Sequence, residues 1–283
     1  MLLSGCLSTT CKCWTSLLQS RLPENGFNII AMACINVIEY STLACAPAQS
    51  IVLSNSDGFA ESIVSSLEDL HKLITNEAKR STSIIANSMF SIPLDCFESV
   101  TALLRVSISI TNELPDACRL FANVRALRII TQLFVDAEEI ATFITSDDPF
   151  FTLMTDCELL AIGLLVNLAE CCIDIRNTIH GLNIEYIDLC AVTYIKPKRN
   201  VKVKKVLGSS ISALVLLSQR FDRRYKCFIN DKKTDDVTLV YLAVLFGSLM
   251  WSHQANRSKI YAVTLFLHQH FNIFRVLESP SPH

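Results

Sequence analysis

Glycine and proline are scarce in this sequence, which contains only 7 glycines and 8 prolines among 283 residues. No Gly-rich phosphate loop, nucleophile elbow or Walker motif occurs. The absence of such motifs predicts a protein that is not an enzyme and needs neither a cofactor nor a small-molecule substrate. With 51% hydrophobic residues and a mean hydropathy of +0.37, the chain is also too apolar to be disordered.

The chain has 12 cysteines, but they are not spaced along the sequence as zinc ligands usually are. There is no Cys-x-x-Cys pair, and Cys11 and Cys13 lack a second pair of ligands. His268 and His270 would point to different sides of a helix, so we expect no metal site. No secretory signal precedes the cysteines, and free thiols pack as small hydrophobes, so we expect reduced thiols in an intracellular core. Seven cysteines fall in or beside apolar segments: Cys34, Cys96, Cys118, Cys157, Cys171, Cys172 and Cys190.

Long hydrophobic runs are missing as well. The longest apolar stretch covers 15 residues, from Val237 to Trp251, whereas a helix that spans a membrane needs about 20. The stretch that begins at Leu159 is shorter still. Both stretches predict helices buried in a protein core, and we expect no membrane contact.

Apolar residues recur at helical spacing along most of the chain, which predicts an all-α fold. Thr155 and Glu158 match a capping box, which would start the helix that contains Leu159. Gly181 stands where a left-handed residue would end a helix. Residues 234–236 give the last strong helix an acidic start. The other expected helices cover residues 28–40, 59–77, 96–111, 119–134 and 140–144.

Two segments near the C-terminal end share one layout, an apolar helix followed by a polar break and a second amphipathic piece. At an offset of 81, Arg176 falls on Arg257. Weaker copies contain Asn36 and Ser109, and equivalent positions (36, 109, 167, 248) are 73, 58 and 81 residues apart. This pattern favours an irregular HEAT or armadillo-like helical repeat, an α-solenoid. We expect Asn167 to bond a neighbouring turn, and the two arginines to brace the repeat through carboxylates or helix-end carbonyls.

Three sequence blocks carry a more specific signal. They are Leu103–Asn112 (LLRVSISITN), the block from Gly163 to Arg176 that begins GLLVNLAE, and the block from Tyr241 to Asn256 that begins YLAVLFG. In this order they resemble the C-terminal domain of the Wapl (wings apart-like) family. The residues before Leu103 match that family less clearly.

The resemblance implies an all-helical, non-catalytic regulator of sister-chromatid cohesion that works in the nucleus on chromosomes. Proteins of this family promote release of the cohesin ring from chromatin together with a HEAT-repeat partner, and their C-terminal domain contacts the ATPase head of a cohesin SMC subunit. The expected partners are therefore the cohesin ATPase head and HEAT-repeat accessory subunits. This chain has no Phe-Gly-Phe motif and no long acidic insertion before the last strong helix, so the resemblance does not extend to recruitment through an N-terminal tail.

Positive charge is concentrated in one part of a chain whose net charge is only −2. Residues 196–233 carry 12 of the 25 lysines and arginines, which indicates a polarised surface. An acidic protein surface, a DNA backbone or a nuclear import receptor would fit it, and a solvated loop would explain it equally. The basic run contains no recognition helix for DNA and no aromatic residues between its basic residues in the pattern of nucleic-acid-binding proteins. We therefore do not expect direct DNA contact to be the main function. The densest part, the basic patch, consists of Lys196, Lys198, Arg199, Lys202, Lys204 and Lys205.

The start of the last strong helix lies next to this basic run and supplies the candidate partner-binding residues. Two of them, Asp235 and Val237, align with the Wapl pattern. We expect the acidic residues Asp136, Glu138 and Glu139 to lie in solvated turns without an acid–base role. The candidate partner-binding residues are Lys232, Lys233, Asp235, Asp236 and Val237.

The expected organisation is one helical-repeat domain over residues 1–283, with a division into lobes of about 1–145 and 146–283 left open. The alternative function is a general armadillo- or HEAT-like interaction scaffold that shares only the repeat core and is unrelated to cohesin. A Wapl-type protein should bind an SMC ATPase head, whereas a general scaffold should bind an extended peptide in a concave groove.

Overall fold

The computed structural model describes residues 2–19, 27, 29–43, 45–55, 58–83, 94–112, 114–141, 149–185, 210–231, 236–251 and 253–260. Of these residues, 90% are helical, which confirms the all-α prediction. The helices are α1 (Leu2–Gln19), α2 (Ile29–Thr42), α3 (Ala46–Asn55), α4 (Phe59–Ser83), α5 (Leu94–Thr111), α6 (Pro115–Phe121), α7 (Val124–Ala141), α8 (Pro149–Cys171), α9 (Ile173–Gly181), α11 (Ala213–Asp231) and α12 (Val237–Met250). Residues 254–260 are also helical, and β1 (Asn183–Ile184) pairs with β2 (Ile211–Ser212).

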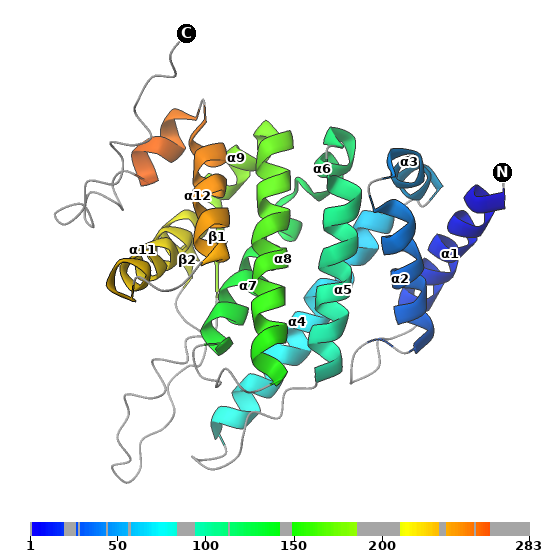
Figure 1. The fold of residues 1–283 in the computed structure, drawn as a ribbon, viewed down its shortest axis with the longest axis horizontal. Helices are drawn as coiled ribbons and strands as arrows, with labels where there is room; N and C mark the ends of the chain where they lie inside the picture. The colour runs from blue at the N-terminus through cyan, green and yellow to red at the C-terminus, as the bar shows by residue number, and fades with distance from the viewer. Residues whose placement is uncertain are drawn as a thin grey trace.

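Five helices stand side by side in one row, in the order α1, α2, α5, α8 and α12, and each packs against the next (Figure 1). The short helices α3, α6 and α9 lie at one edge of this row (Figure 1). Helices α4 and α7 lie behind the row and pack against each other, and α11 is joined to α7 by ion pairs. The chain therefore passes three times through the same order, a helix of the row, a short helix, and a helix of the second layer.

The helices form where apolar residues recur every three or four positions. In α4 the side chains of Ile63, Leu67, Leu70 and Ile74 are all buried, as their spacing predicts. Helix α7 buries almost its whole length from Ala126 to Ile140, because α4 and α8 both pack against it.

A hydrogen-bond pattern recurs four times along the row and ties its helices together. Gln49, Cys118, Arg176 and Asn256 each donate to the carbonyl seven residues earlier, at the end of the preceding row helix. The distances are 3.1 Å from Gln49 Nε2 to Thr42 O, 3.3 Å from Cys118 Sγ to Thr111 O, 3.2 Å from Arg176 Nε to Ala169 O and 3.0 Å from Asn256 Nδ2 to Leu249 O. We call these four donors the rung residues.

Each rung residue also reaches a carbonyl of a neighbouring passage of the chain. Gln49 donates to Ser109 O at 2.6 Å, Cys118 to Asn167 O at 3.8 Å, and Arg176 to Trp251 O at 2.9 Å. Asn256 turns back and donates to Arg176 O at 2.9 Å. Helix-end carbonyls have no partner within their own helix. The buried contacts to Thr42 O, Ser109 O, Thr111 O and Leu249 O satisfy such carbonyls and link the helices of the row, whereas the contact from Arg176 to Trp251 O is exposed.

The rung residues refine the register expected from the sequence. They are 69, 58 and 80 residues apart (49 to 118, 118 to 176, 176 to 256), against the expected 73, 58 and 81. Arg176 therefore corresponds to Asn256 and not to Arg257. The prediction that Arg176 braces helix-end carbonyls is confirmed, and Asn167 contacts Thr111 Oγ1 at 3.5 Å at the end of α5, as expected.

Two expected helix boundaries are wrong, and a third is right in position but not in conformation. Helix α8 begins at Pro149, so Thr155 lies inside it and donates to Phe151 O at 2.9 Å instead of capping a helix. Gly181 ends α9 without a positive φ. The segment 119–134 is broken because Asn123 Oδ1 accepts from Ala126 N at 2.9 Å, which makes Asn123 the cap of α7.

Helix α8 is the central helix of the row and packs against α5, α7 and α12. Its residues Phe150–Cys171 are long and apolar enough to cross a membrane by length and composition, and half of that stretch is buried inside the molecule. The expectation that no apolar helix reaches this length is therefore wrong for α8, because the helix begins earlier than its sequence pattern suggested. A buried core helix meets the same criterion.

Replacing Asn256 by alanine tests the rung contacts. The change removes the donor to two carbonyls, Leu249 O and Arg176 O, and leaves both without that partner. We expect Asn256→Ala to lower the free energy of unfolding by about 1–3 kcal/mol in urea titrations. Asn112→Ala, at an exposed turn residue, is the matched control and should change it by less than about 0.5 kcal/mol. Equal effects of the two changes would contradict a structural role for the rungs.

Candidate functional site

The predicted partner-binding residues flank the end of α11 and the start of α12. Asp236 and Val237 are described, whereas Lys232, Lys233 and Asp235 lie outside the described residues. The whole basic patch, Lys196, Lys198, Arg199, Lys202, Lys204 and Lys205, lies outside them too. The structure nevertheless fixes where both stretches are attached, because it describes the residues on either side of each.

The stretch that contains the basic patch leaves and returns at one place. Strands β1 and β2 pair antiparallel, with Asn183 opposite Ser212 and Ile184 opposite Ile211. Ala213 N, at the start of α11, donates to Leu182 O at 2.9 Å. This strand pair was not expected from the sequence. It joins the end of α9 to the start of α11, so residues 186–209 depart from this junction.

Asp236 fixes the start of α12. Its Oδ1 accepts from Leu239 N at 3.0 Å, which is the N-cap contact that its position before the helix predicts. The Arg224 Nη1 atom of α11 lies 3.0 Å and 3.1 Å from the two Asp236 oxygens. Val237 follows with 51% of its surface exposed. Asp236 is therefore held by intramolecular contacts, while Val237 is available to a partner.

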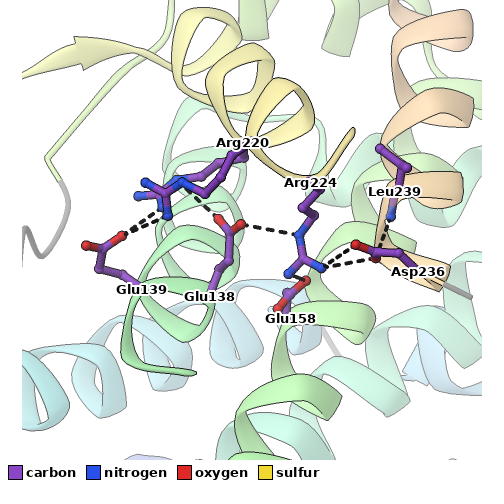
Figure 2. Close-up of polar contacts among 8 residues, drawn as sticks. Glu138, Glu139, Glu158, Arg220, Arg224, Asp236 and Leu239 are labelled. Atoms are coloured by element: carbon purple, nitrogen blue, oxygen red, sulfur yellow. Dashed lines mark hydrogen bonds and ion pairs between the residues drawn. The ribbon is translucent and has the colours of Figure 1, made fainter. Parts of the chain in front are cut away.

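Arg224 is the centre of a buried ionic cluster, shown in Figure 2. Besides Asp236, its guanidinium contacts Glu138 Oε1 of α7 at 3.2 Å and Glu158 of α8. Only 20% of the Arg224 side chain is exposed, and 3% of the Glu158 side chain. One arginine thus joins α7, α8, α11 and the cap of α12.

Arg220, one turn earlier on α11, extends the cluster to a second acidic residue of α7. Its Nη1 atom lies 2.7 Å from Glu139 Oε2, and its Nε atom lies 3.1 Å from Glu138 Oε2 (Figure 2). Arg223 adds a longer contact of 3.6 Å to Glu139. Four carboxylates face three guanidiniums, so the ionic cluster carries one net negative charge when all groups are ionised.

The ionic cluster corrects two sequence-based expectations. Asp136, Glu138 and Glu139 are buried in α7 with 3%, 3% and 2% of their surface exposed, and do not lie in solvated turns. Arg220 and Arg224 were counted in the basic run but point inward. A usable signal was present, because Leu216, Leu217, Arg220 and Arg224 recur at helical spacing, and the arginines continue the buried face of α11.

Burial dominates the electrostatics of Glu158. Desolvation raises the pKa of Glu158 from 4.5 to about 7, although the nearby Arg224 guanidinium and the Thr238 hydroxyl oppose this rise. Burial opposes the charged form of Arg224, but the carboxylates of Glu158, Glu138 and Asp236 outweigh this effect and raise the pKa of Arg224. The ionic cluster therefore holds an arginine that stays charged next to a carboxyl group that titrates near neutral pH.

The ionic cluster holds α7, α8, α11 and the start of α12 together. All the acidic groups of the ionic cluster contact arginines. A cavity of about 490 Å³ lies elsewhere, between α2 and α5, and its polar lining includes Asn36, Glu98 and Ser99 but no acid–base pair. Within the part of the chain that the structure describes, no three His, Cys, Asp or Glu side chains are arranged to hold a metal ion.

The buried cysteines behave as hydrophobic core residues. Burial raises the pKa of Cys11 to about 11 and that of Cys118 to about 12, and it raises the pKa of Cys157 as well. A thiol with a raised pKa is a poor nucleophile at neutral pH. All the cysteines that the structure describes are free thiols, and Cys190 lies outside the described residues.

Comparison with protein-family models, with curated proteins and with solved structures gives no match for this chain.

The raised pKa of Glu158 predicts a pH-dependent stability. The unfolded chain releases this proton near pH 4.5 and the folded protein near pH 7, so folding keeps a proton that the unfolded state loses. Stability is therefore lost as the pH rises through this window, at about 1.4 kcal/mol per pH unit. We expect the free energy of unfolding of Glu158→Gln, relative to wild type, to rise by about 2–3 kcal/mol between pH 4.5 and pH 7.5.

The matched control is Asp156→Asn, two residues earlier on α8, where the side chain is exposed. Its stability relative to wild type should show no comparable rise over the same range. Urea titrations at each pH give both curves. A flat curve for Glu158→Gln would contradict a titrating buried carboxyl group.

Proposed function

We propose that the chain is an irregular armadillo-like α-solenoid that acts as a Wapl-type regulator of sister-chromatid cohesion. It works without catalysis, in the nucleus on chromosomes, and promotes release of cohesin from chromatin. Its partners in this proposal are the SMC ATPase head and the HEAT-repeat accessory subunits of cohesin. The single observation that carries the proposal is the order of the three Wapl-like sequence blocks.

The positions of these blocks support a repeat protein. The first block lies in α5, the second runs from α8 to the rung residue Arg176, and the third runs from α12 to the rung residue Asn256. They therefore mark successive helices of the row, and the second and third blocks extend into the short helix that follows. Stacked helical repeats present long surfaces to other proteins, which suits a regulator that acts by binding.

The burial of the same blocks favours the alternative function, a general interaction scaffold that is unrelated to cohesin. Their apolar residues are mostly core residues that any helical repeat needs, among them Leu103, Leu104, Leu164, Leu165, Leu245 and Leu249. Such a scaffold would bind an extended peptide in its groove. The two candidate functions differ in the partner that they require, so a binding experiment separates them.

The partner surface that we propose combines Val237 with Lys232, Lys233 and Asp235, and the basic patch is a second candidate contact. Asp236 is better left unchanged in experiments, because it caps α12 and pairs with Arg224. Its contacts tie the partner surface to the ionic cluster and hence to α7 and α8. A partner that contacts this surface would therefore bind to a firmly attached part of the molecule.

Charge reversal tests this proposal directly. The purified chain is incubated with cohesin ATPase heads and with the HEAT-repeat accessory subunits at two salt concentrations. We expect capture that weakens with salt, because exposed charges are screened. The variant Lys232→Glu, Lys233→Glu, Asp235→Lys should reduce capture by about tenfold at the lower salt concentration and leave the thermal midpoint of unfolding unchanged.

Arg128→Glu is the control, since Arg128 is also basic and exposed but lies on α7. It should leave capture unchanged. Failure of the folded wild-type chain to capture any cohesin component would contradict the Wapl-type proposal. Binding of extended peptides by the same protein would then support the general scaffold.

A further inference from the structure

Two pairs of cysteine thiols face each other across neighbouring helices. The Cys34 thiol of α2 makes a side-chain hydrogen bond with Cys13 of α1, and the Cys118 thiol of α6 makes one with Cys171 of α8. All four are free thiols. A disulfide bond forms only between cysteines that lie close together and point their side chains towards each other. Each pair is therefore a candidate site of reversible oxidation.

Exposure to solvent separates the two pairs. Cys13 is exposed and Cys34 is half-buried, so an oxidant in solution reaches the first pair directly. Cys118, in contrast, is 0% exposed and donates as a rung residue to two carbonyls. Burial also raises the pKa of Cys118 to about 12, so its sulfur is a poor nucleophile at neutral pH. The pair of Cys13 and Cys34 is therefore the reactive one.

The packing of α1 on α2 keeps Cys13 and Cys34 together (Figure 1). Trp14, directly after Cys13, is 1% exposed, and its ring meets the Phe27 ring edge to face with 5.0 Å between the ring centroids. Ile35, directly after Cys34, is buried as well, with 2% of its surface exposed. A buried neighbour thus fixes the backbone beside each thiol, and the two sulfurs stay close without a bond between them.

The two thiols are suited to different steps of an oxidation. The exposed Cys13 is the sulfur that meets the oxidant first. Burial and the hydrogen bond with Cys13 raise the pKa of the Cys34 thiol, so Cys34 keeps its proton at neutral pH. Cys34 is also in position to react with an oxidised Cys13 sulfur. An accessible cysteine beside a second, resolving cysteine is typical of redox-sensitive sites.

We infer that Cys13 and Cys34 are a redox-sensitive thiol pair, which a hydroperoxide oxidises to a disulfide bond between α1 and α2. The Cys13 thiolate attacks one oxygen of hydrogen peroxide, the O–O bond breaks, and the leaving hydroxide takes up a proton to become water. The Cys34 sulfur then attacks the sulfur of the Cys13 sulfenic acid, the S–O bond breaks, and a second water leaves with the Cys34 proton. Two thiols are oxidised and one peroxide is reduced, and a dithiol reductant reverses the change.

The disulfide bond would fasten the end of the row. Among the described helices of the row, α1 stands at the end and has one row neighbour, α2 (Figure 1). The end units of stacked helical proteins open most easily, because each unit is held only by its neighbours. A bond that closes the loop of residues 13–34 restricts the unfolded chain and so holds α1 in place. Oxidation of this pair requires no cohesin component and does not depend on the proposed function.

Disulfide mapping in the full-length chain tests this inference. The reduced protein is treated with hydrogen peroxide, the remaining thiols are blocked with N-ethylmaleimide, and the chain is digested with trypsin and a glutamate-specific protease. Cys13 and Cys34 then lie on peptides 13–21 and 25–39, which contain no other cysteine. We expect mass spectrometry to find these peptides linked, at a yield at least about tenfold above that of a bond between Cys118 and Cys171, and separate after dithiothreitol. Equal yields for the two pairs, or no link between the two peptides, would overturn the inference.

Two serine variants separate pairing from simple exposure. In Cys34→Ser the resolving thiol is gone, so the Cys13 sulfenic acid should persist and react with dimedone about tenfold more than in wild type. Cys6→Ser removes another exposed thiol of α1 and is the matched control, which should leave the yield of linked peptides unchanged. If Cys13 reacts equally with dimedone in wild type and in Cys34→Ser, with both proteins helical by circular dichroism, Cys34 is not its partner.

Hydrogen exchange measures the consequence for α1. The amides of α1 should exchange about tenfold or more slowly in the oxidised protein than in the reduced protein, because the bond opposes local opening. The amides of α8, which is central in the row, should exchange at the same rate in both forms. Unchanged exchange in α1 despite a mapped disulfide bond would contradict the fastening of this helix.

Discussion

The fold depends on how the ends of its buried helices are satisfied. The last carbonyls of an α-helix have no partner in their own helix, and tight turns between apolar helices keep water away from them. Here four rung residues, each seven positions after such a carbonyl, donate to it and to a second carbonyl of a neighbouring passage. A buried acceptor left without a partner costs about 1–3 kcal/mol. These contacts therefore determine which helices stand next to each other.

The ionic cluster performs the same task for the second layer. Arg220 and Arg224 reach from α11 to α7, α8 and the cap of α12, so one face of α11 holds three other helices in place. Burying charges is costly, so removing one partner of such a set would leave an uncompensated buried charge and destabilise the fold strongly. Lys232, Lys233 and Asp235 lie in the sequence between Asp231, the last residue of α11, and Asp236, so the chain on both sides of these residues is held by the described contacts.

The sequence predicted the helices well where apolar periodicity was strong, as in α4 and α5, and it predicted the spacing of 58 between two copies. The predicted spacing was wrong by four residues for the first copy (73 against 69) and by one residue for the last copy (81 against 80), where the identical residues Arg176 and Arg257 were matched. In the structure the equivalent residues are those that lie seven positions after the acceptor carbonyl of each row helix, whatever their type. An amide, a thiol and a guanidinium all serve as rung donors. Glu138 and Arg220 were read as solvent-exposed although the spacing of Leu216, Leu217 and Arg220 indicates that Arg220 lies on the buried face of α11. That local pattern does not identify the partner of Arg220, because Glu138 lies 82 residues away in the chain (138 to 220).

The central claim is that this helical row binds cohesin through the surface at the start of α12. Crosslinking with a lysine-reactive reagent, followed by mass spectrometry on the chain mixed with assembled cohesin, tests it most directly. The account predicts crosslinks from Lys232, Lys233 and the basic patch to the SMC ATPase head or the accessory subunits, and few from Lys12 in α1 or Lys72 in α4. An absence of crosslinks to cohesin, or crosslinks concentrated at Lys12 and Lys72, would contradict it.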